Sequence, residues 1–217
     1  MSAVAPSPLT YFASPERQSP EGLAQQVAQF EDMGALARVL DLIPSFVMIL
    51  NRQRQLLFGN RALREFTRPR QNAGLVGLRP GELLACHHAA GAPNGCGTSE
   101  ACRTCGAANA ILAGLQGNHS RHECRVRTTE HESLDLRVEA SPFRWLDNDY
   151  VLVIATDIGD LKRRQVLERL FFHDILNTAG GIQGLAEIID MNPGEAAQLS
   201  GDLRQVAETL VNEIRMQ

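Results

Sequence analysis

Residues 120–157 decide the fold class, and they read SRHECRVRTTEHESLDLRVEASPFRWLDNDYVLVIATD. Apolar and charged side chains alternate here, so that Leu136 and Val138 fall on one face of an extended chain and Arg137 on the other. A period of two residues is typical of a strand with one face on a core and the other toward a polar environment. The pattern predicts three antiparallel strands, at residues 123–127, 134–140 and 150–155.

The sequence before this stretch predicts the rest of an α+β domain. Two short apolar segments, at residues 45–50 and 53–58, are expected to complete a five-stranded antiparallel sheet. Short helices are expected at residues 60–66, 75–84 and 107–115. Further upstream, helical spacing of apolar residues predicts an amphipathic helix over residues 21–42, and the proline-rich residues 1–20 are expected to form a disordered tail.

The order of these elements is two strands, several short helices and then three strands. This order resembles that of a Per-Arnt-Sim (PAS) sensor domain, and the resemblance places such a domain at residues 43–158. It implies that this part of the chain receives a signal. The segment Ala155-Thr156-Asp157-Ile158 also resembles the exit of PAS domains, which implies that Asp157 anchors the last strand to a following helix.

Beyond Asp157 the pattern becomes helical. Residues 161–189 contain no proline and are expected to form one long helix. The segment 192–195, NPGE, has a capping residue followed by proline, which is typical of a helix start, and a second helix follows it. The helices predict a hairpin over residues 159–217, and their apolar stripes favour a homodimer that forms a four-helix bundle. The stripes comprise Leu167, Phe171, Ile175, Thr178, Ile182, Leu185 and Ile189 on the first helix, and Leu199, Leu203, Val206, Leu210 and Ile214 on the second.

His173 is expected to point away from the apolar stripe of the long helix. It lies two residues from Phe171 and from Ile175, which is about 200° around the helix from each. A single histidine is more often a bystander than a functional group. An exposed imidazole beside a carboxylate, that of Asp174, nevertheless suits a phosphoryl acceptor, and Asn177 lies one turn further on the same face.

Residues 173–177, HDILN, resemble the phosphoacceptor box of sensor histidine kinases. The resemblance implies that His173 is phosphorylated, that Asp174 is the acid/base, and that Asn177 positions water for the phosphatase reaction. It also implies ATP, bound by an ATP-binding domain, and a response regulator as partners. No ATP-binding domain follows the second helix, so we expect the chain to be part of a longer kinase and inactive by itself.

Four of the five cysteines lie within twenty residues, and they are Cys86, Cys96, Cys102 and Cys105. Clustered thiols in a reducing compartment indicate metal or redox chemistry. We expect a four-thiolate metal site in the loop 86–105, holding either structural zinc or an iron–sulfur cluster, and the glycine after Cys105 favours a zinc knuckle slightly. Reversible thiol–disulfide sensing and cysteines without a role are the alternatives. Cys124 is expected to be a small buried hydrophobic residue.

The composition excludes several other classes of protein. The 217 residues carry 21 Lys and Arg against 25 Asp and Glu, and a net charge of −4 offers no attraction to nucleic acid or an anionic membrane surface. No apolar run approaches the ~20 residues of a membrane-spanning helix, and the N-terminus has no secretory signal pattern. We expect the cytoplasmic input half of a sensor histidine kinase; the alternative is a non-catalytic metal- or redox-binding module that only dimerises through its hairpin.

Overall fold

The computed structural model describes residues 10–68, 74–130, 132–192, 194 and 196–215. The chain divides into two compact units, Met1–Gly159 and Asp160–Gln217. Within the described parts, no helix is both long and apolar enough to span a membrane.

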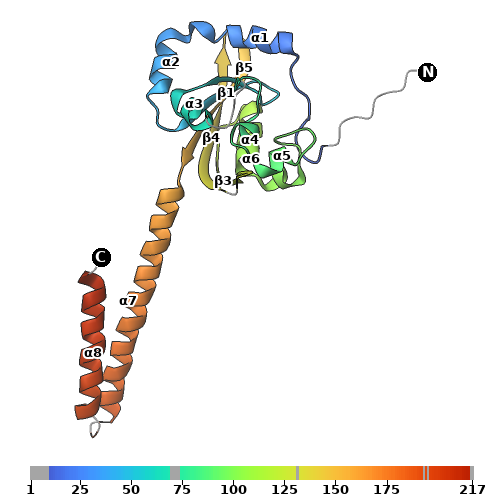
Figure 1. Cartoon of the computed structure of the whole chain (residues 1–217). Helices are drawn as coiled ribbons and strands as arrows, with labels where there is room; N and C mark the ends of the chain where they lie inside the picture. The colour runs from blue at the N-terminus through green and yellow to red at the C-terminus, as the bar shows by residue number, and fades with distance from the viewer. Residues whose placement is uncertain (1–9, 69–73, 131, 193, 195, 216–217) are drawn as a thin grey trace. The chain divides into compact units, whose positions relative to one another are not determined.

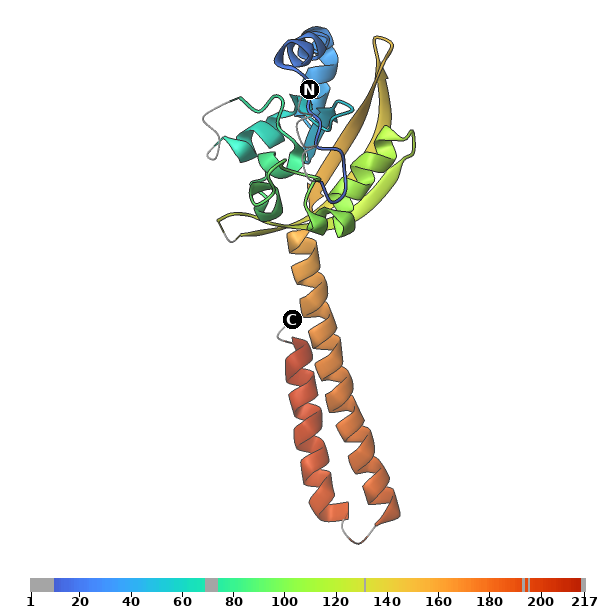
Figure 2. The same cartoon turned by 90° about the vertical axis from the view of Figure 1, so that its right-hand side faces the viewer.

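The first unit is built on a five-stranded antiparallel sheet with the strand order β2-β1-β5-β4-β3 (Figures 1 and 2). The strands are β1 Phe46–Leu50, β2 Leu56–Gly59, β3 Ser120–Arg127, β4 Ser133–Trp145 and β5 Asn148–Asp157. All five predicted strands are present, and the order of elements agrees with the PAS architecture expected from the sequence. On β4 the predicted alternation buries Leu136, Val138 and Ala140.

The second strand begins later than predicted because residues 51–55 form a hydrogen-bonded turn. The side-chain oxygen of Asn51 accepts the backbone N–H of Gln53 at 3.0 Å and that of Gln55 at 2.9 Å. Arg54, between them, has a φ of 64° and is only 5% exposed. The turn therefore places an arginine inside the domain.

One face of the sheet is covered by four helices and the loops between them (Figure 1). The helices are α3 Arg61–Thr67, α4 Pro80–Leu83, α5 His87–Ala90 and α6 Gly106–Leu115, and a 3-10 helix, η2 Glu100–Thr104, precedes the last. α6 packs on β3, β4 and β5. Its Ile111 joins Leu136, Val138 and Val153 in the main hydrophobic core.

The N-terminal helices pack on the opposite face. The sequence predicts one helix over residues 21–42, but the structure has α1 Pro20–Ala28, the 3-10 turn η1 Glu31–Met33 and α2 Gly34–Asp41. The prediction of a single helix is wrong because the chain bends at Gly34, whose φ of 45° lies outside the helical region. Phe30 and Met33 both turn inward just before this bend. These side chains are buried in a second cluster with Ile49, Leu57 and Tyr150.

Residues 10–19 are not the disordered tail that the sequence predicts. The backbone N–H groups of Tyr11 and Ala13 donate to carbonyl groups in the segment 97–98, at 3.0 and 2.9 Å. Main-chain hydrogen bonds thus order this segment against the cysteine-rich loop although it contributes little apolar surface. Residues 1–9 of the predicted tail lie outside the described residues.

Arg79 joins this N-terminal segment to the cysteine-rich loop. Its side chain is fully buried. A guanidinium has five N–H donors, and burying it is costly unless they find acceptors. Here each donor has its own backbone carbonyl, and these belong to Pro15, Glu16, Gln53, Asn94 and Cys96.

The second unit contains two helices, α7 Gly159–Met191 and α8 Ala196–Arg215. They lie side by side in both views (Figures 1 and 2). The predicted stripes are half-buried over most of their length, whereas Leu167 and Ile214 at their ends are 66% and 51% exposed. Pro193 and Glu195 of the predicted helix start lie outside the described residues. The dimer and its four-helix bundle stay a prediction.

Candidate functional site

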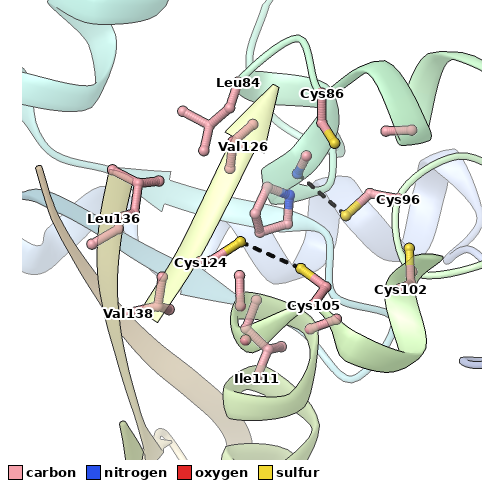
Figure 3. A pocket seen from close by; sticks show the side chains of 18 of the residues that line it. Leu84, Cys86, Cys96, Cys102, Cys105, Ile111, Cys124, Val126, Leu136 and Val138 are labelled. Carbon is pink, nitrogen blue, oxygen red and sulfur yellow. Dashed lines mark hydrogen bonds between the residues drawn. The ribbon is translucent and has the colours of Figure 1, made fainter. Parts of the chain in front are cut away.

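A cavity of about 260 Å³ lies between the main core face of the sheet and the cysteine-rich loop. Sheet residues such as Met48, Leu136 and Val153 form one wall, and the start of α6 contributes to another. All five cysteines of the chain line this cavity (Figure 3). The thiols that are clustered in the sequence are therefore also clustered in space.

The four cysteines predicted as metal ligands come from different elements around the cavity. Cys86 precedes α5, Cys96 lies in the following loop, Cys102 lies in η2, and Cys105 caps the start of α6. Among the described residues, no three His, Cys, Asp or Glu side chains are grouped as a single metal ion would require. The thiols thus share one cavity without converging on one point, and their role as ligands stays a prediction.

Cys124 on β3 is the fifth thiol, and sequence analysis gave it no functional role. Its side chain is buried, and its Sγ lies 3.5 Å from the Sγ of Cys105 (Figure 3). Strand alternation correctly predicts that Cys124 points inward together with Val126. No pattern in the sequence predicts that this face of β3 lies opposite the first turn of α6.

The close approach of α6 to β3 depends on Gly106. A Cβ atom at this position would lie 2.1 Å from the carbonyl oxygen of Glu123, so no larger residue fits without a shift of the backbone. The sequence predicts that the glycine after Cys105 lets an N–H group reach a sulfur. In the structure the N–H groups of Ala107 and Ala108, which follow Gly106, bind the Cys105 sulfur. A second such contact, not predicted, comes from the N–H of Gly81, which donates to the Sγ of Cys96 at 3.3 Å.

The pKa values of Cys105 and Cys124 are shifted in opposite directions. The hydrogen bond from the Cys124 thiol, with smaller contributions from the N–H groups of Ala108 and Ala107, lowers the pKa of Cys105 to about 6. The hydrogen bond that it donates raises the pKa of Cys124, and burial adds to the rise. The unpaired N–H groups of a helix start favour a negative charge. These contacts therefore favour the thiolate form of Cys105.

Two other thiols of the cavity are held in the protonated form. Burial raises the pKa of Cys96 to about 12, although the N–H of Gly81 opposes the rise. Burial also raises the pKa of Cys86. A soft metal ion deprotonates cysteine when it binds. The cavity thus combines one thiol whose ionisation is favoured, Cys105, with two protonated thiols that such an ion would deprotonate.

Arg54 brings a positive charge to the same cavity. It is 5% exposed and lines the cavity wall. A terminal nitrogen donates to the carbonyl of Ser14 at 2.6 Å. Its Nε, by contrast, is one of only two buried side-chain nitrogen or oxygen atoms in the described residues that lack a hydrogen-bond partner. A buried cation with an unused donor therefore lines the same cavity as the thiols.

His173 lies on α7, in the second unit, on an exposed face as the sequence predicts. Its side chain is 71% exposed and that of Asp174 is 69% exposed. The His173 Nδ1 lies 3.3 Å from the Asp174 Oδ1, and the Asn177 Nδ2 lies 3.1 Å from Nδ1 and 3.4 Å from Nε2. The helix thus brings the three side chains into one polar group, whose catalytic roles stay predictions.

No protein-family profile and no curated protein matches the sequence. The chain is similar to the solved PAS domain of an HTR-like protein from Haloarcula marismortui, with 14% identity, 59% of this chain and 98% of that chain covered, and a TM-score of 0.40. It is also similar to the PAS domain of nitrogen regulation protein NR(II) from Vibrio parahaemolyticus, with 17% identity, coverage of 57% and 97%, and a TM-score of 0.40. It is similar as well to a PAS domain from a two-component sensor histidine kinase, with 10% identity, 58% of this chain and 96% of that chain covered, and a TM-score of 0.37. Similarities this low carry no argument about function, which has to come from the residues of the chain itself.

Proposed function

We propose that this chain is the input and phosphoacceptor part of a cytoplasmic two-component sensor histidine kinase. The PAS-like unit would receive the signal, and α7 would carry the phosphoacceptor. The observation that carries this proposal is the exposed group of His173, Asp174 and Asn177. A phosphoacceptor has to be reached first by an ATP-binding domain and then by a response regulator, and a histidine that is 71% exposed is accessible to both.

The group has the chemistry that phosphoryl transfer to an imidazole requires. With Nδ1 protonated and hydrogen-bonded to Asp174, the Nε2 of His173 keeps its lone pair and is the nucleophile. It attacks the γ-phosphorus of ATP held by a separate domain, ADP leaves, and Asp174 accepts the Nδ1 proton. Transfer of the phosphoryl group to an aspartate of the response regulator restores the free histidine. Asn177 would orient water for hydrolysis.

The second unit also favours a homodimer. Phe172 and Leu176, one turn apart on α7, are 60% and 70% exposed, and α8 has no fully buried side chain. A single pair of helices therefore leaves apolar surface in water, and a second copy would cover it in a four-helix bundle.

The cavity lined by cysteines is the proposed input site. We expect Cys86, Cys96, Cys102 and Cys105 to hold zinc or an iron–sulfur cluster, since both take thiolate ligands. Thiol–disulfide exchange within the cavity is the alternative use of the same residues.

Phosphorylation of the full chain tests the kinase assignment. Radiolabelled ATP with a separately purified ATP-binding domain of a histidine kinase is one phosphodonor. Radiolabelled phosphoramidate, a small donor that needs no such domain, is the second. We expect acid-labile label on the wild-type chain and on Asn177→Ala, and none on His173→Gln. His119→Gln, which changes an exposed histidine of the first unit, is the matched control and keeps its label. Label that survives in His173→Gln excludes this site.

A second candidate function is a non-catalytic metal- or redox-binding module that dimerises through its helices. The five thiols around one cavity favour it, because that site does not depend on His173. A wild-type chain that takes up metal but no label from either donor would support this candidate.

A further inference from the structure

Besides the four clustered cysteines, the cavity of the first unit is lined by a fifth thiol, that of Cys124, and by a buried cation, Arg54. We propose that it binds an anionic polythiolate metal centre in which Cys124 is a ligand and Arg54 balances the negative charge. This inference rests on the proposed metal site at the four clustered cysteines. It adds two residues that spacing in the sequence does not single out.

The position of Cys124 is that of a neighbouring ligand to Cys105. Thiolates bound about 2.3 Å from one tetrahedral centre lie roughly 3.8 Å from each other. The Sγ atoms of Cys124 and Cys105 are 3.5 Å apart and line the same cavity. Only a small adjustment would therefore bring both sulfurs into one coordination sphere.

Arg54 indicates that the occupant of the cavity is negatively charged. Its guanidinium is buried, lines the cavity and has an Nε–H without an acceptor among the described residues. Buried charges are normally paired and buried donors are normally satisfied. A metal centre with four or more thiolate ligands carries a net negative charge, and its sulfurs accept hydrogen bonds. Such a centre would pair the buried charge of Arg54 and would accept the hydrogen bond of its Nε–H.

The size of the cavity favours a cluster over a single zinc ion. One zinc ion draws its sulfurs to about 2.3 Å, and no three donors among the described residues are arranged in that way. The thiols instead lie among the residues that line a cavity of about 260 Å³, which is large enough to hold iron and sulfide ions. Zinc and iron–sulfur centres share the same ligand chemistry, so the test has one arm for each.

The test is metal loading of the full chain under anaerobic, reducing conditions. One arm supplies ferrous iron with sulfide and the other supplies zinc, and bound metal and sulfide are measured after gel filtration together with the visible spectrum. We expect the wild-type chain to hold iron and sulfide in equal amounts and Cys124→Ala to lose them. Arg54→Met is expected to weaken metal retention against a chelator by about tenfold or more, and Arg54→Lys by less.

Two matched controls accompany these variants. Val126→Ala removes atoms from the same face of β3 and from the same cavity wall, but it removes no thiol. Arg52→Met removes a different arginine, two residues before Arg54. The side chain of Arg52 is 72% exposed. Both controls are expected to load as the wild-type chain does.

Alkylation of the wild-type chain gives a readout that does not depend on the folding of a variant. Because the pKa of Cys124 is raised, we expect iodoacetamide to label it in the metal-free chain only well above neutral pH, and to leave it unlabelled in the loaded chain at the same pH. Equal labelling of Cys124 in the loaded and the metal-free chain overturns its role as a ligand.

The loading outcomes separate this inference from the proposed metal site. Uptake of neither metal by the wild-type chain overturns both. Equal loading of the wild-type chain, Cys124→Ala and Arg54→Met overturns this inference alone and leaves the four-cysteine site. Zinc uptake that is lost in the two variants supports the ligand set with zinc as the metal.

Discussion

Cys105 and Cys96 line the same cavity, but their surroundings shift their pKa values in opposite directions. The hydrogen bond from Cys124 lowers the pKa of Cys105 to about 6, whereas burial raises that of Cys96 to about 12. Because only the thiolate is alkylated, we expect iodoacetamide to label Cys105 of the reduced, metal-free chain at neutral pH, with a half-maximal rate near pH 6. Cys96 is expected to stay unlabelled under the same conditions. Mass mapping of peptides over a pH series measures both.

Two variants of Cys124 are the control for this prediction. Cys124→Ser keeps a hydrogen-bond donor and is expected to keep the low labelling midpoint of Cys105, whereas Cys124→Ala is expected to raise it. Equal midpoints in the two variants would contradict the proposed cause. The lowered pKa also stabilises the fold above the pKa of an unfolded cysteine, and this contribution is lost as the pH falls through about 6.

Single residues were predictable from the sequence where a regular period governs them. The helical period correctly predicts that His173 is exposed, and the strand period correctly predicts that Cys124 points inward. The contact between Cys124 and Cys105 could not be predicted, because it depends on the placement of α6 over β3. Arg54 gave no signal at all, since a buried arginine in a turn has the same local sequence as an exposed one.

At the scale of elements, the approach of α6 to β3 at Gly106 sets the geometry of the thiol pair. The methyl group of Gly106→Ala would meet the Glu123 carbonyl oxygen at 2.1 Å and push the start of α6 away from the strand. We expect a loss of about 1–3 kcal/mol in the free energy of unfolding, as is typical of overpacking. The labelling midpoint of Cys105 is expected to rise as its hydrogen bond lengthens. Urea denaturation and the alkylation series measure the two effects.

Gly74→Ala is the matched control for this substitution, because, its chain neighbours aside, no atom of the described residues lies within 4 Å of a Cβ at that position. We expect its stability to stay within about 0.5 kcal/mol of the wild-type value. If the two alanine variants were equally stable, the contact with Glu123 would not be the constraint described here.

Sequence patterns predicted which helices and strands are present, but not where they are interrupted. The five strands and the long helix were predicted. The bend between α1 and α2 was missed because Phe30 and Met33 fit a helical stripe equally well. The positive φ of Gly34, which interrupts the helix, leaves no mark on that apolar spacing. The late start of β2 was missed because the side chain of Asn51 replaces a strand by a turn.

At the scale of the whole molecule, the exposed apolar surface of α7 predicts self-association. Leu176 is 70% exposed, and burial of a leucine contributes about 1.5–3 kcal/mol. We expect the wild-type chain to sediment as a dimer and Leu176→Glu to dissociate at concentrations about tenfold higher or more. Leu42→Glu, at a leucine of the first unit that is 76% exposed, is the matched control and should remain dimeric. A monomeric wild-type chain, or equal dissociation of both variants, would contradict the predicted bundle.

The hydrogen bonds of Arg79 have a practical consequence for where this domain can be cut. Two of its five acceptors belong to Pro15 and Glu16, which precede the first helix. A fragment beginning at Pro20 would retain every helix and strand of the domain. Two N–H donors of the buried Arg79 guanidinium would nevertheless lose their acceptors. The same guanidinium holds the carbonyl groups of Asn94 and Cys96, so the damage would reach the cysteine-rich loop. An expression fragment that begins at α1 would therefore destabilise the cysteine-rich loop, which forms part of the cavity wall.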